Sequence, residues 1–357
     1  MYNLFMKEYE HTNPAAEIFH AGLQAVDPYK AVSLHTDKIK SVFRQGNFRK
    51  LLVSGFGKAA CPMAKALEDH IGDIIDTGIV ITKYGHSESR KPEGSSQKLK
   101  IKTLEAGHPV PDENGVRGTD EIIALLKGAD EHTLVVCLIS GGGSALLVSA
   151  FQGITLSEKQ EITQLLLKSG ADINELNCVR KHISKVKGGR LAEIAYPAKV
   201  ISLILSDVIG DSLDVIASGP TAPDSATYSD ALYVLRKYRL LDKIPRTISD
   251  ILSNGADGLI PDTPKEGSVI FRKIENIIIG SNRIALDAAR QMAKEKGFDA
   301  DIISAGLTGE ARDAAKWLAK KAIEEKAARG QRARCLISGG ETTVTVKGSG
   351  LGGRNTE

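Results

Sequence analysis

Paired cysteines are missing from this sequence, although it is 357 residues long. Its four cysteines, Cys61, Cys137, Cys178 and Cys335, form no C-x-x-C pair, which argues against zinc ribbons and redox dithiols. Cys137 and Cys335 lie inside apolar runs and are predicted to be small core residues. A reducing cytoplasm is therefore the simplest compartment for this chain.

Long apolar runs and a large net charge are lacking too. No run approaches the roughly 20 residues of a membrane span, and residues 1–10 lack the apolar core of a signal peptide. The 47 Lys and Arg residues nearly balance the 44 Asp and Glu residues, leaving a formal net charge of +3. This balance argues against nucleic acid as a partner, and neither it nor the hydropathy indicates a membrane.

Glycine, in contrast, is plentiful, and many of the 35 glycines follow apolar runs, as in the ligand loops of α/β enzymes. Apolar runs alternate with helical patterns, which predicts a doubly wound α/β fold. The expected strands are 51–55, 78–83, 133–139, 200–205, 276–279, 300–303 and 335–337. The expected helices are 14–32, 58–70, 114–126, 157–169, 187–194, 283–296 and 310–326.

Four local expectations accompany this assignment. The continuous apolar run 133–139 is typical of a strand buried on both faces of a parallel sheet. Ser157, with Gln160 three residues later, is the expected N-cap of its helix. Residues 342–347 alternate like an antiparallel strand, and residues 91–97 are expected to form a polar loop.

Two domains are expected, at about 150 residues per domain. Six Pro and Gly residues fall between positions 240 and 273, which places an N-terminal domain at 1–240, a linker at 241–272 and a smaller C-terminal α/β domain at 273–357. The sequence stops in a Gly-rich segment that normally feeds a helix. We therefore expect the C-terminal domain to be truncated.

The strongest local signal is the segment Ser140, Gly141, Gly142, Gly143, Ser144, between a predicted strand and a predicted helix. Glycines let backbone N–H groups converge, and a helix N-terminus adds a positive dipole, so the segment suits a phosphate or carboxylate. The alternative is a tight turn without a ligand.

Lys58 follows a second Gly loop, Gly55-Phe56-Gly57. A lysine at a helix N-terminus opposes the helix dipole, which indicates an anionic partner nearby. A solvated lysine is an equally good interpretation, and the segment is no Walker A loop.

A basic stretch, residues 177–190, carries five Lys and Arg residues. Arg180, Lys187 and Arg190 could clamp phosphate oxygens, although a solvated basic helix face is the commoner explanation. His182 in the same stretch is expected at the surface or in a cap rather than as a general base.

Carboxylates follow the strand 200–205 at Asp207, Asp211 and Asp214. This is the end of the strand at which α/β sheets bind ligands, so Asp207 could hold Mg²⁺ or accept a hydroxyl proton. Turn formation is the alternative. Residues 348–353 match G-x-G-x-x-G, but no acidic residue follows about 20 positions later.

Taken together, nine motifs occur in an order that resembles the class II glycerate 2-kinases, which carry a MOFRL domain at the C-terminus. They are Gly55-x-Gly57-Lys58-Ala59, Gly107-His-Pro-x-Pro-Asp112, Ser140-Gly-Gly-Gly-Ser144, Asn177-x-x-Arg180, Lys187-Gly-Gly-Arg190, Ser206-Asp-Val-x-Gly-Asp211, Ala217-Ser-Gly-Pro-Thr221, Ser338-Gly-Gly-Glu-Thr-Thr343 and Gly352-Gly-Arg-Asn355. The resemblance covers nearly the whole chain.

This resemblance implies a Rossmann-like, mostly parallel three-layer N-terminal domain. It also implies ATP- and Mg²⁺-dependent phosphorylation of D-glycerate at the 2-hydroxyl, giving 2-phosphoglycerate and ADP. By motif, Lys58 matches a substrate-binding lysine and Arg354 an arginine implicated in catalysis. From placement, we assign the phosphates to residues 140–144, Lys187, Gly339 and Gly340. The remaining assignments are substrate to Gly57, Arg180 and Asn355, and metal to Asp207 and Asp211.

Two other functions stay open at this point. One is an NAD-dependent hydroxypyruvate reductase, a name that family members have carried. The other is a sugar-phosphate-binding protein without catalysis. No oligomeric state follows from the sequence, and a homodimer is one candidate.

Overall fold

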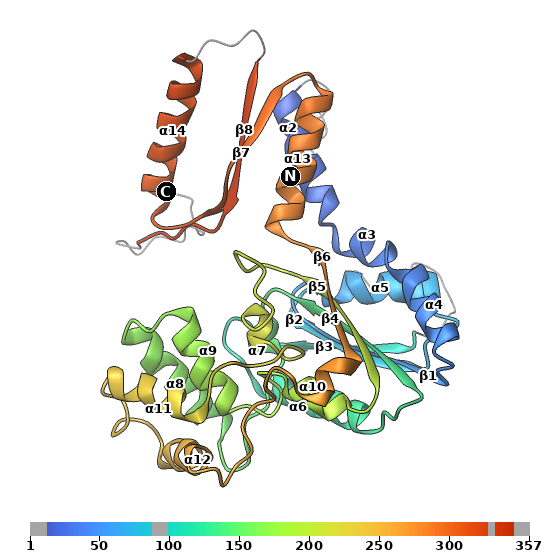
Figure 1. Ribbon diagram of the computed structural model, residues 1–357, viewed down its shortest axis with the longest axis vertical. Coiled ribbons are helices and arrows are strands. Elements are labelled where there is room, and N and C mark those ends of the chain that lie inside the picture. Colours follow the sequence, from blue (N-terminus) through green and yellow to red (C-terminus); the bar gives the residue numbers. More distant parts are fainter. Residues whose placement is uncertain (1–12, 88–98, 328–332, 346–357) are drawn as a thin grey trace. The chain divides into compact units, whose positions relative to one another are not determined.

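A computed structural model of the chain describes residues 13–87, 99–327 and 333–345. The chain divides into two compact units (Figure 1). The larger unit is Ala31–Ile279, and the smaller unit combines Met1–Lys30 with Gly280–Glu357. None of the described helices is both long and apolar enough to span a membrane.

A six-stranded sheet of order β3-β2-β1-β4-β5-β6 forms the centre of the larger unit. The strands are β1 (Lys50–Phe56), β2 (Thr77–Lys83), β3 (Ile101–Ala106), β4 (Thr133–Ser140), β5 (Lys199–Leu205) and β6 (Ile274–Gly280). The pairs β3·β2, β2·β1, β1·β4 and β4·β5 are parallel. Every residue of β4 is buried, as its continuous apolar run predicts.

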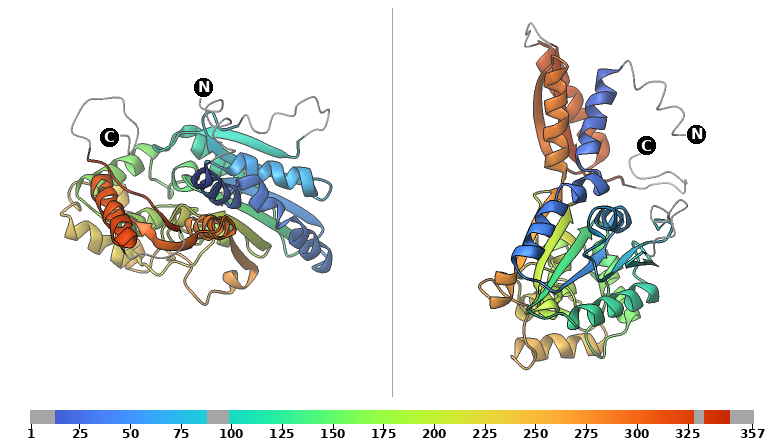
Figure 2. Two further views of the ribbon diagram at one scale, coloured as in Figure 1. Left: turned by 90° about the horizontal axis from the view of Figure 1, so that it is seen from above. Right: turned by 90° about the vertical axis from the view of Figure 1, so that its right-hand side faces the viewer.

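Helices cover both faces of this sheet, so the predicted three-layer Rossmann-like α/β fold is confirmed (Figure 2). On one face, α5 (Ala60–Ile71) packs on the strands and α4 (Thr36–Gln45) packs on α5. On the other face lie α6 (Glu113–Lys127) and α10 (Arg190–Ala195). Strand order reverses between β1 and β4, the point at which such sheets bind ligands.

A helical subdomain with its own apolar core extends the larger unit. Helices α9 (Ile173–His182), α11 (Tyr228–Lys237) and α12 (Arg246–Ala256) enclose it with α8 (Leu156–Lys168). The N-cap of α8 is Thr155, whose hydroxyl and Glu158 form a capping box, so the expected cap at Ser157 is wrong.

The smaller unit is built on the parallel pair β7 (Asp299–Leu307) and β8 (Arg334–Gly340). Helix α13 (Asn282–Glu295) packs on both strands and on α2 (Pro14–Ala25), while α14 (Ala311–Ala327) follows β7. Ile18 of α2 is buried with Leu286 and Ala289 of α13. These contacts give the smaller unit a core drawn from both ends of the chain.

The unit boundaries differ from those expected at residues 240 and 273. Residues 241–272 contain α12, which packs on α11, and β6 completes the large sheet. The opening helix, expected over 14–32, ends at Ala25, and Pro28 begins α3 (Pro28–Ser33) after Asp27. The antiparallel strand expected at 342–347 is wrong within the described residues, since Thr343 forms a single parallel bridge with Glu310.

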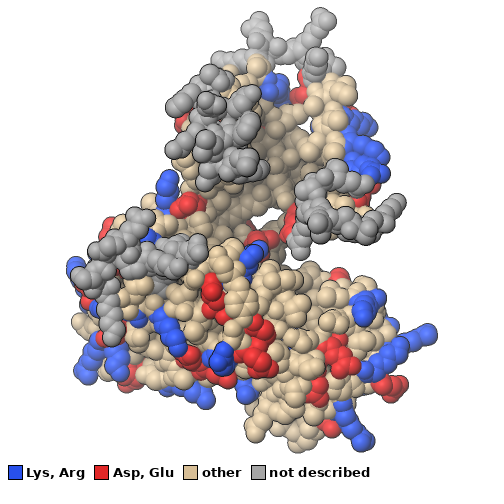
Figure 3. Space-filling view, turned by 180° about the vertical axis from the view of Figure 1, so that it is seen from behind, with Lys and Arg blue, Asp and Glu red and all other residues tan. Residues whose placement is uncertain are grey.

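Charges of both signs occur on the larger unit. Figure 3 shows one face of the molecule, on which neither basic nor acidic side chains cover the surface alone. That face therefore offers no broad basic surface of the kind that binds nucleic acid.

Candidate active site

The two Gly loops lie side by side at the carboxyl ends of β1 and β4. Phe56 and Ile139 are register partners, so the residues after them emerge together. The backbone N–H of Lys58 donates to the carbonyl of Gly141 at 2.9 Å, and that of Ala59 donates to Ser140 Oγ at 3.1 Å. These two hydrogen bonds connect the loop before α5 with the loop 140–144.

Gly57 allows the two loops to approach each other closely because it has no side chain. Its φ is +128°, and a Cβ there would lie 2.1 Å from Ser140 Oγ. Lys58 is exposed in the turn before α5, not in the helix as expected. The Lys58 side chain therefore projects from a fixed backbone next to the loop 140–144.

Two glycine variants separate the backbone requirement from side-chain contact. We expect Gly57→Ala to lower the free energy of unfolding by about 2–4 kcal/mol, because both its φ and its space exclude a side chain. Gly141→Ala should cost under about 1 kcal/mol, because the three atoms nearest to its Cβ all belong to the exposed side chain of Asp207, whose Oδ2, at 2.3 Å, can move away. Urea unfolding of both variants checks this, and equal losses would contradict it.

The expected helix after the loop 140–144 is only one turn long, α7 (Gly143–Leu146). Such a short element has little dipole, so anion binding here cannot rest on a helix N-terminus. The hydroxyls of Ser140 and Ser144 already have partners within the protein. Cationic side chains supply a stronger reason to expect an anion.

Arg180 and Lys187 converge on Ser144. Arg180 Nη2 donates to Ser144 Oγ at 2.6 Å, and Lys187 Nζ donates to the Ser144 carbonyl at 2.8 Å. Lys159 lies close enough for its charge to act on Lys187. Lys187 is fully buried, Lys159 is 4% exposed, and Arg180 is half-buried.

None of these three cations has an ion pair with a carboxylate in the described part of the chain. Burial lowers the pKa of Arg180 to about 10, and burial with the Arg180 charge lowers the pKa of Lys159 to about 7. Burial and both neighbouring charges hold the pKa of Lys187 well below its usual value. A bound anion would relieve this repulsion.

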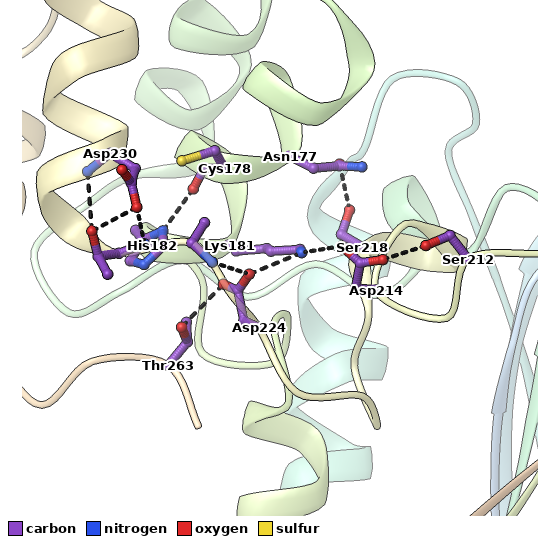
Figure 4. A network of polar contacts seen from close by, with 12 residues as sticks. Asn177, Cys178, Lys181, His182, Ser212, Asp214, Ser218, Asp224, Asp230 and Thr263 are labelled. Carbon is purple, nitrogen blue, oxygen red and sulfur yellow. Dashed lines mark hydrogen bonds and ion pairs between the residues drawn. The ribbon is translucent and has the colours of Figure 1, made fainter. Parts of the chain in front are cut away.

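Lys181, the next residue after Arg180, differs from it because two carboxylates neutralise its charge. Its Nζ donates to Asp224 Oδ1 at 3.0 Å and lies 3.4 Å from Asp214 Oδ2 (Figure 4). Asp224 is 1% exposed and accepts a hydrogen bond from Thr263 at 3.0 Å. Lys181 and Asp214 therefore serve the fold, which leaves Arg180 as the cation available on this turn of α9.

His182 is buried, so the expected surface position is wrong, while the alternative of a capping role is not contradicted. Its Nδ1 is 2.7 Å from the Cys178 carbonyl and its Nε2 is 2.9 Å from Asp262 Oδ1. Arg190 is also turned away from the Gly loop, with Nη2 3.2 Å from both Tyr228 Oη and the Pro261 carbonyl. The expected helix at 187–194 begins only at Arg190, because Gly188 and Gly189 have positive φ.

Asp207 is exposed just after β5, and its Oδ2 lies against Gly141. Asp211 follows in a turn with φ +55°. Over residues 13–87, 99–327 and 333–345, no three His, Cys, Asp or Glu side chains could hold a metal ion together. Kinase sites typically bind Mg²⁺ through one or two carboxylates plus substrate phosphates, and an exposed Asp207 fits that pattern.

Four predicted site residues remain, Gly339, Gly340, Arg354 and Asn355. Gly339 and Gly340 end β8 in the smaller unit. Arg354, Asn355 and the 348–353 motif lie outside the described residues, as does the polar loop expected at 91–97.

Four residues near the loops carry no predicted role. His108 lies against Gly142, where a Cβ would be 2.9 Å from the ring. Lys159 lies near Lys187, on which its charge acts. Ser218 forms hydrogen bonds with Asn177 and with Ser144, the residue that Arg180 and Lys187 both contact. His108, Asn177 and Ser218 fall inside quoted motifs, which could have marked them, whereas nothing in the local sequence marks Lys159 as buried.

The comparisons with known proteins agree on one family. A model described as a domain of unknown function, DUF4147, matches residues 14–253. A D-glycerate 2-kinase from Thermotoga maritima is 44% identical over 347 residues, covering 96% of this chain and 76% of that protein. An Agrobacterium vitis relative with the provisional name hydroxypyruvate reductase is 41% identical, covering 86% of this chain and 76% of that protein.

A solved structure shows the same architecture. The crystal structure of a glycerate kinase from Thermotoga maritima superposes with a TM-score of 0.79 at 43% identity. The match covers 95% of this chain and 76% of that one.

Proposed function

This chain belongs to the glycerate 2-kinase family, and from that membership we propose that it transfers the γ-phosphoryl group of ATP to the 2-hydroxyl of D-glycerate. The observation that carries the proposal is the pair of cations at the loop after β4, Arg180 and Lys187, which have no carboxylate partner among the residues that the structure describes. The reactants both carry anionic groups, which suit such a site.

Phosphoryl transfer needs little covalent chemistry from the protein and depends on positioning and charge neutralisation. The glycerate 2-oxygen attacks the γ-phosphorus, the bond to the β-phosphate oxygen breaks, and ADP leaves. Lys58 would hold the glycerate carboxylate or the transferring phosphoryl group, with Gly57 fixing its backbone. Arg180 would bind the glycerate. Lys187 and the loop 140–144 would bind the phosphates of the nucleotide.

Asp207 would either accept the hydroxyl proton or, with Asp211, bind Mg²⁺. Mg²⁺ would neutralise the phosphate charge when bound. Arg354 would stabilise the transferring γ-phosphoryl group, and Asn355 would bind the substrate. Gly339 and Gly340 would bind nucleotide phosphates.

A coupled assay of ADP release with D-glycerate, scoring 2-phosphoglycerate against 3-phosphoglycerate, tests the function. We expect ADP and 2-phosphoglycerate in equal amounts. Oxidation of NADH by hydroxypyruvate without ATP would instead favour a reductase. Tight binding of a sugar phosphate without turnover would favour a binding protein.

Asp207→Asn separates the two roles of that carboxylate, since it keeps the shape and removes the charge. If Asp207 binds Mg²⁺, half-maximal rate should need about tenfold more Mg²⁺. If it accepts the proton, kcat should fall by about 10²–10⁴ at unchanged Mg²⁺ dependence. Titration of the rate with Mg²⁺ distinguishes them, and a variant unchanged in both respects would exclude both roles.

A further inference from the structure

The hydroxyl of Ser144 is the meeting point of several hydrogen bonds. Its Oγ lies 2.6 Å from Arg180 Nη2, 3.2 Å from Lys187 Nζ and 2.7 Å from Ser218 Oγ. Ser218 Oγ donates in turn to Asn177 Oδ1 at 2.9 Å, a contact visible in Figure 4. Four segments of the larger unit are thereby linked through one serine.

The chemistry of these groups fixes the direction of each bond. An amide oxygen only accepts, so the single hydroxyl hydrogen of Ser218 goes to Asn177. Ser144 must therefore donate its own hydrogen to Ser218. The lone pairs of Ser144 Oγ are left to accept from Arg180 and Lys187, which have only donors to offer.

Lys187 depends on these oxygens for its charge. Its Nζ also lies 2.8 Å from the Ser144 carbonyl and 3.3 Å from the Leu147 carbonyl. Three accepting oxygens require three N–H groups, which only the ammonium form has. Burial and the charges of Arg180 and Lys159 act in the opposite direction on the pKa of Lys187.

The backbone of Ser218 is held in a conformation that it would not adopt freely. Ala217 and Ser218 have φ of +52° and +63°, in the left-handed region that disfavours side chains. Such residues persist where surrounding contacts demand them, and here they aim the Ser218 hydroxyl between Ser144 and Asn177.

We propose that Ser144, Ser218 and Asn177 form a positioning relay that keeps Arg180 oriented and Lys187 charged for a carboxylate or phosphate of the substrates. The proposal rests on the proposed function. It makes Ser144 a residue that acts through the two cations, because its hydroxyl hydrogen is already committed to Ser218 and cannot be donated to a phosphate.

Ser144→Ala is the principal test, with Ser184→Ala as the matched control. Ser184 is a fully buried serine between Arg180 and Lys187 in sequence, but within the described residues its hydroxyl forms hydrogen bonds with the Ser149 carbonyl and the Val186 N–H and with neither cation. We expect Ser144→Ala to raise KM for D-glycerate or ATP about tenfold or more. Ser184→Ala should leave KM within about twofold, and Ser144→Thr, which keeps the hydroxyl, should restore most of the affinity.

The pH profile of kcat/KM supplies a readout that simple loss of packing would not move. Ser144→Ala removes an acceptor of Lys187, and Ser218→Ala removes the group that takes the Ser144 hydrogen and so keeps the Ser144 lone pairs toward the cations. In both variants Lys187 should lose its proton at lower pH, so the alkaline limb should shift to lower pH, but not in Ser184→Ala. Ser218→Ala also keeps the Gly loop intact if Ser144→Ala does not fold. Unshifted limbs together with unchanged KM in both folded variants would overturn the relay.

Binding of inorganic phosphate separates this proposal from the proposed function. Phosphate should raise the Tm of the wild-type chain, and the rise should shrink in Ser144→Ala and Arg180→Ala but not in Ser184→Ala. If the wild type lacks kinase activity but this pattern holds, the proposed function fails and the relay stands. If the kinase is active and Ser144→Ala behaves as Ser184→Ala in phosphate binding and in its pH profile, the relay fails.

Discussion

Lys58→Ala should abolish most glycerate phosphorylation while leaving the fold intact. The side chain is exposed, so its loss disturbs no core, whereas the backbone that holds it is fixed by Gly141 and Ser140. Removing a charge-assisted contact to a desolvated anion typically costs about 2–5 kcal/mol, which is roughly 30- to several thousand-fold in kcat/KM. A loss mainly in kcat would place Lys58 on the transferring phosphoryl group, and a loss mainly in KM would place it on the carboxylate.

Lys65→Ala is the matched control for this experiment. Lys65 lies on α5, the helix that follows Lys58, and forms an exposed ion pair with Asp69. Such surface pairs contribute little, so Lys65→Ala should keep turnover within about twofold. Turnover of Lys58→Ala within about threefold of wild type would contradict the assignment of Lys58 to the site.

The largest effect on stability is expected for Asp224→Ala. This variant leaves the buried Lys181 ammonium with Asp214, at 3.4 Å, as its one remaining carboxylate in the described part of the chain, and it removes the nearer of the two acceptors of the Thr263 hydroxyl. Breaking a buried pair on one side typically costs about 3–5 kcal/mol. Guanidinium unfolding followed by circular dichroism measures the loss.

The double variant Lys181→Met with Asp224→Leu tests the cause of that loss. It removes both charges together, so no uncompensated ion remains, and it should recover a large part of the stability. A loss under about 1 kcal/mol for Asp224→Ala would mean that the buried Lys181–Asp224 pair contributes little to the stability of the fold. Recovery that fails in the double variant would point to packing rather than charge.

How far the sequence predicts this fold depends on the kind of signal each segment carries. β1 and β4 were predictable because a strand buried on both faces must be apolar throughout. β3 (Ile101–Ala106) was not predicted, because it lies at the sheet edge and only its end residues are buried. The sequence contains the signal for the N-cap of α8, since Thr155 and Glu158 have the spacing of a capping box. The prediction chose Ser157 instead.

The candidate site divides in the same way. Its Gly loops are local in sequence and could be recognised there, whereas their side-by-side position follows from the pairing of β1 with β4, which local sequence does not determine. The basic stretch 177–190 could not be interpreted, because the partners that decide each charge are distant in sequence. Lys181 is neutralised by Asp224, 43 residues away, and Arg180 contacts Ser144, 36 residues away. Local spacing cannot tell these two neighbours apart.

The pairing of α2 with α13 also constrains how the protein is made. α2 leaves the ribosome roughly 250 residues before α13, a delay of tens of seconds at about 5–20 residues per second. A helix of 12 residues is marginal alone in water, so α2 gains its partner for Ile18 only after α13 has been made. The larger unit can thus fold before the smaller unit does, whereas the smaller unit must combine α2 with segments that are made only after the whole larger unit.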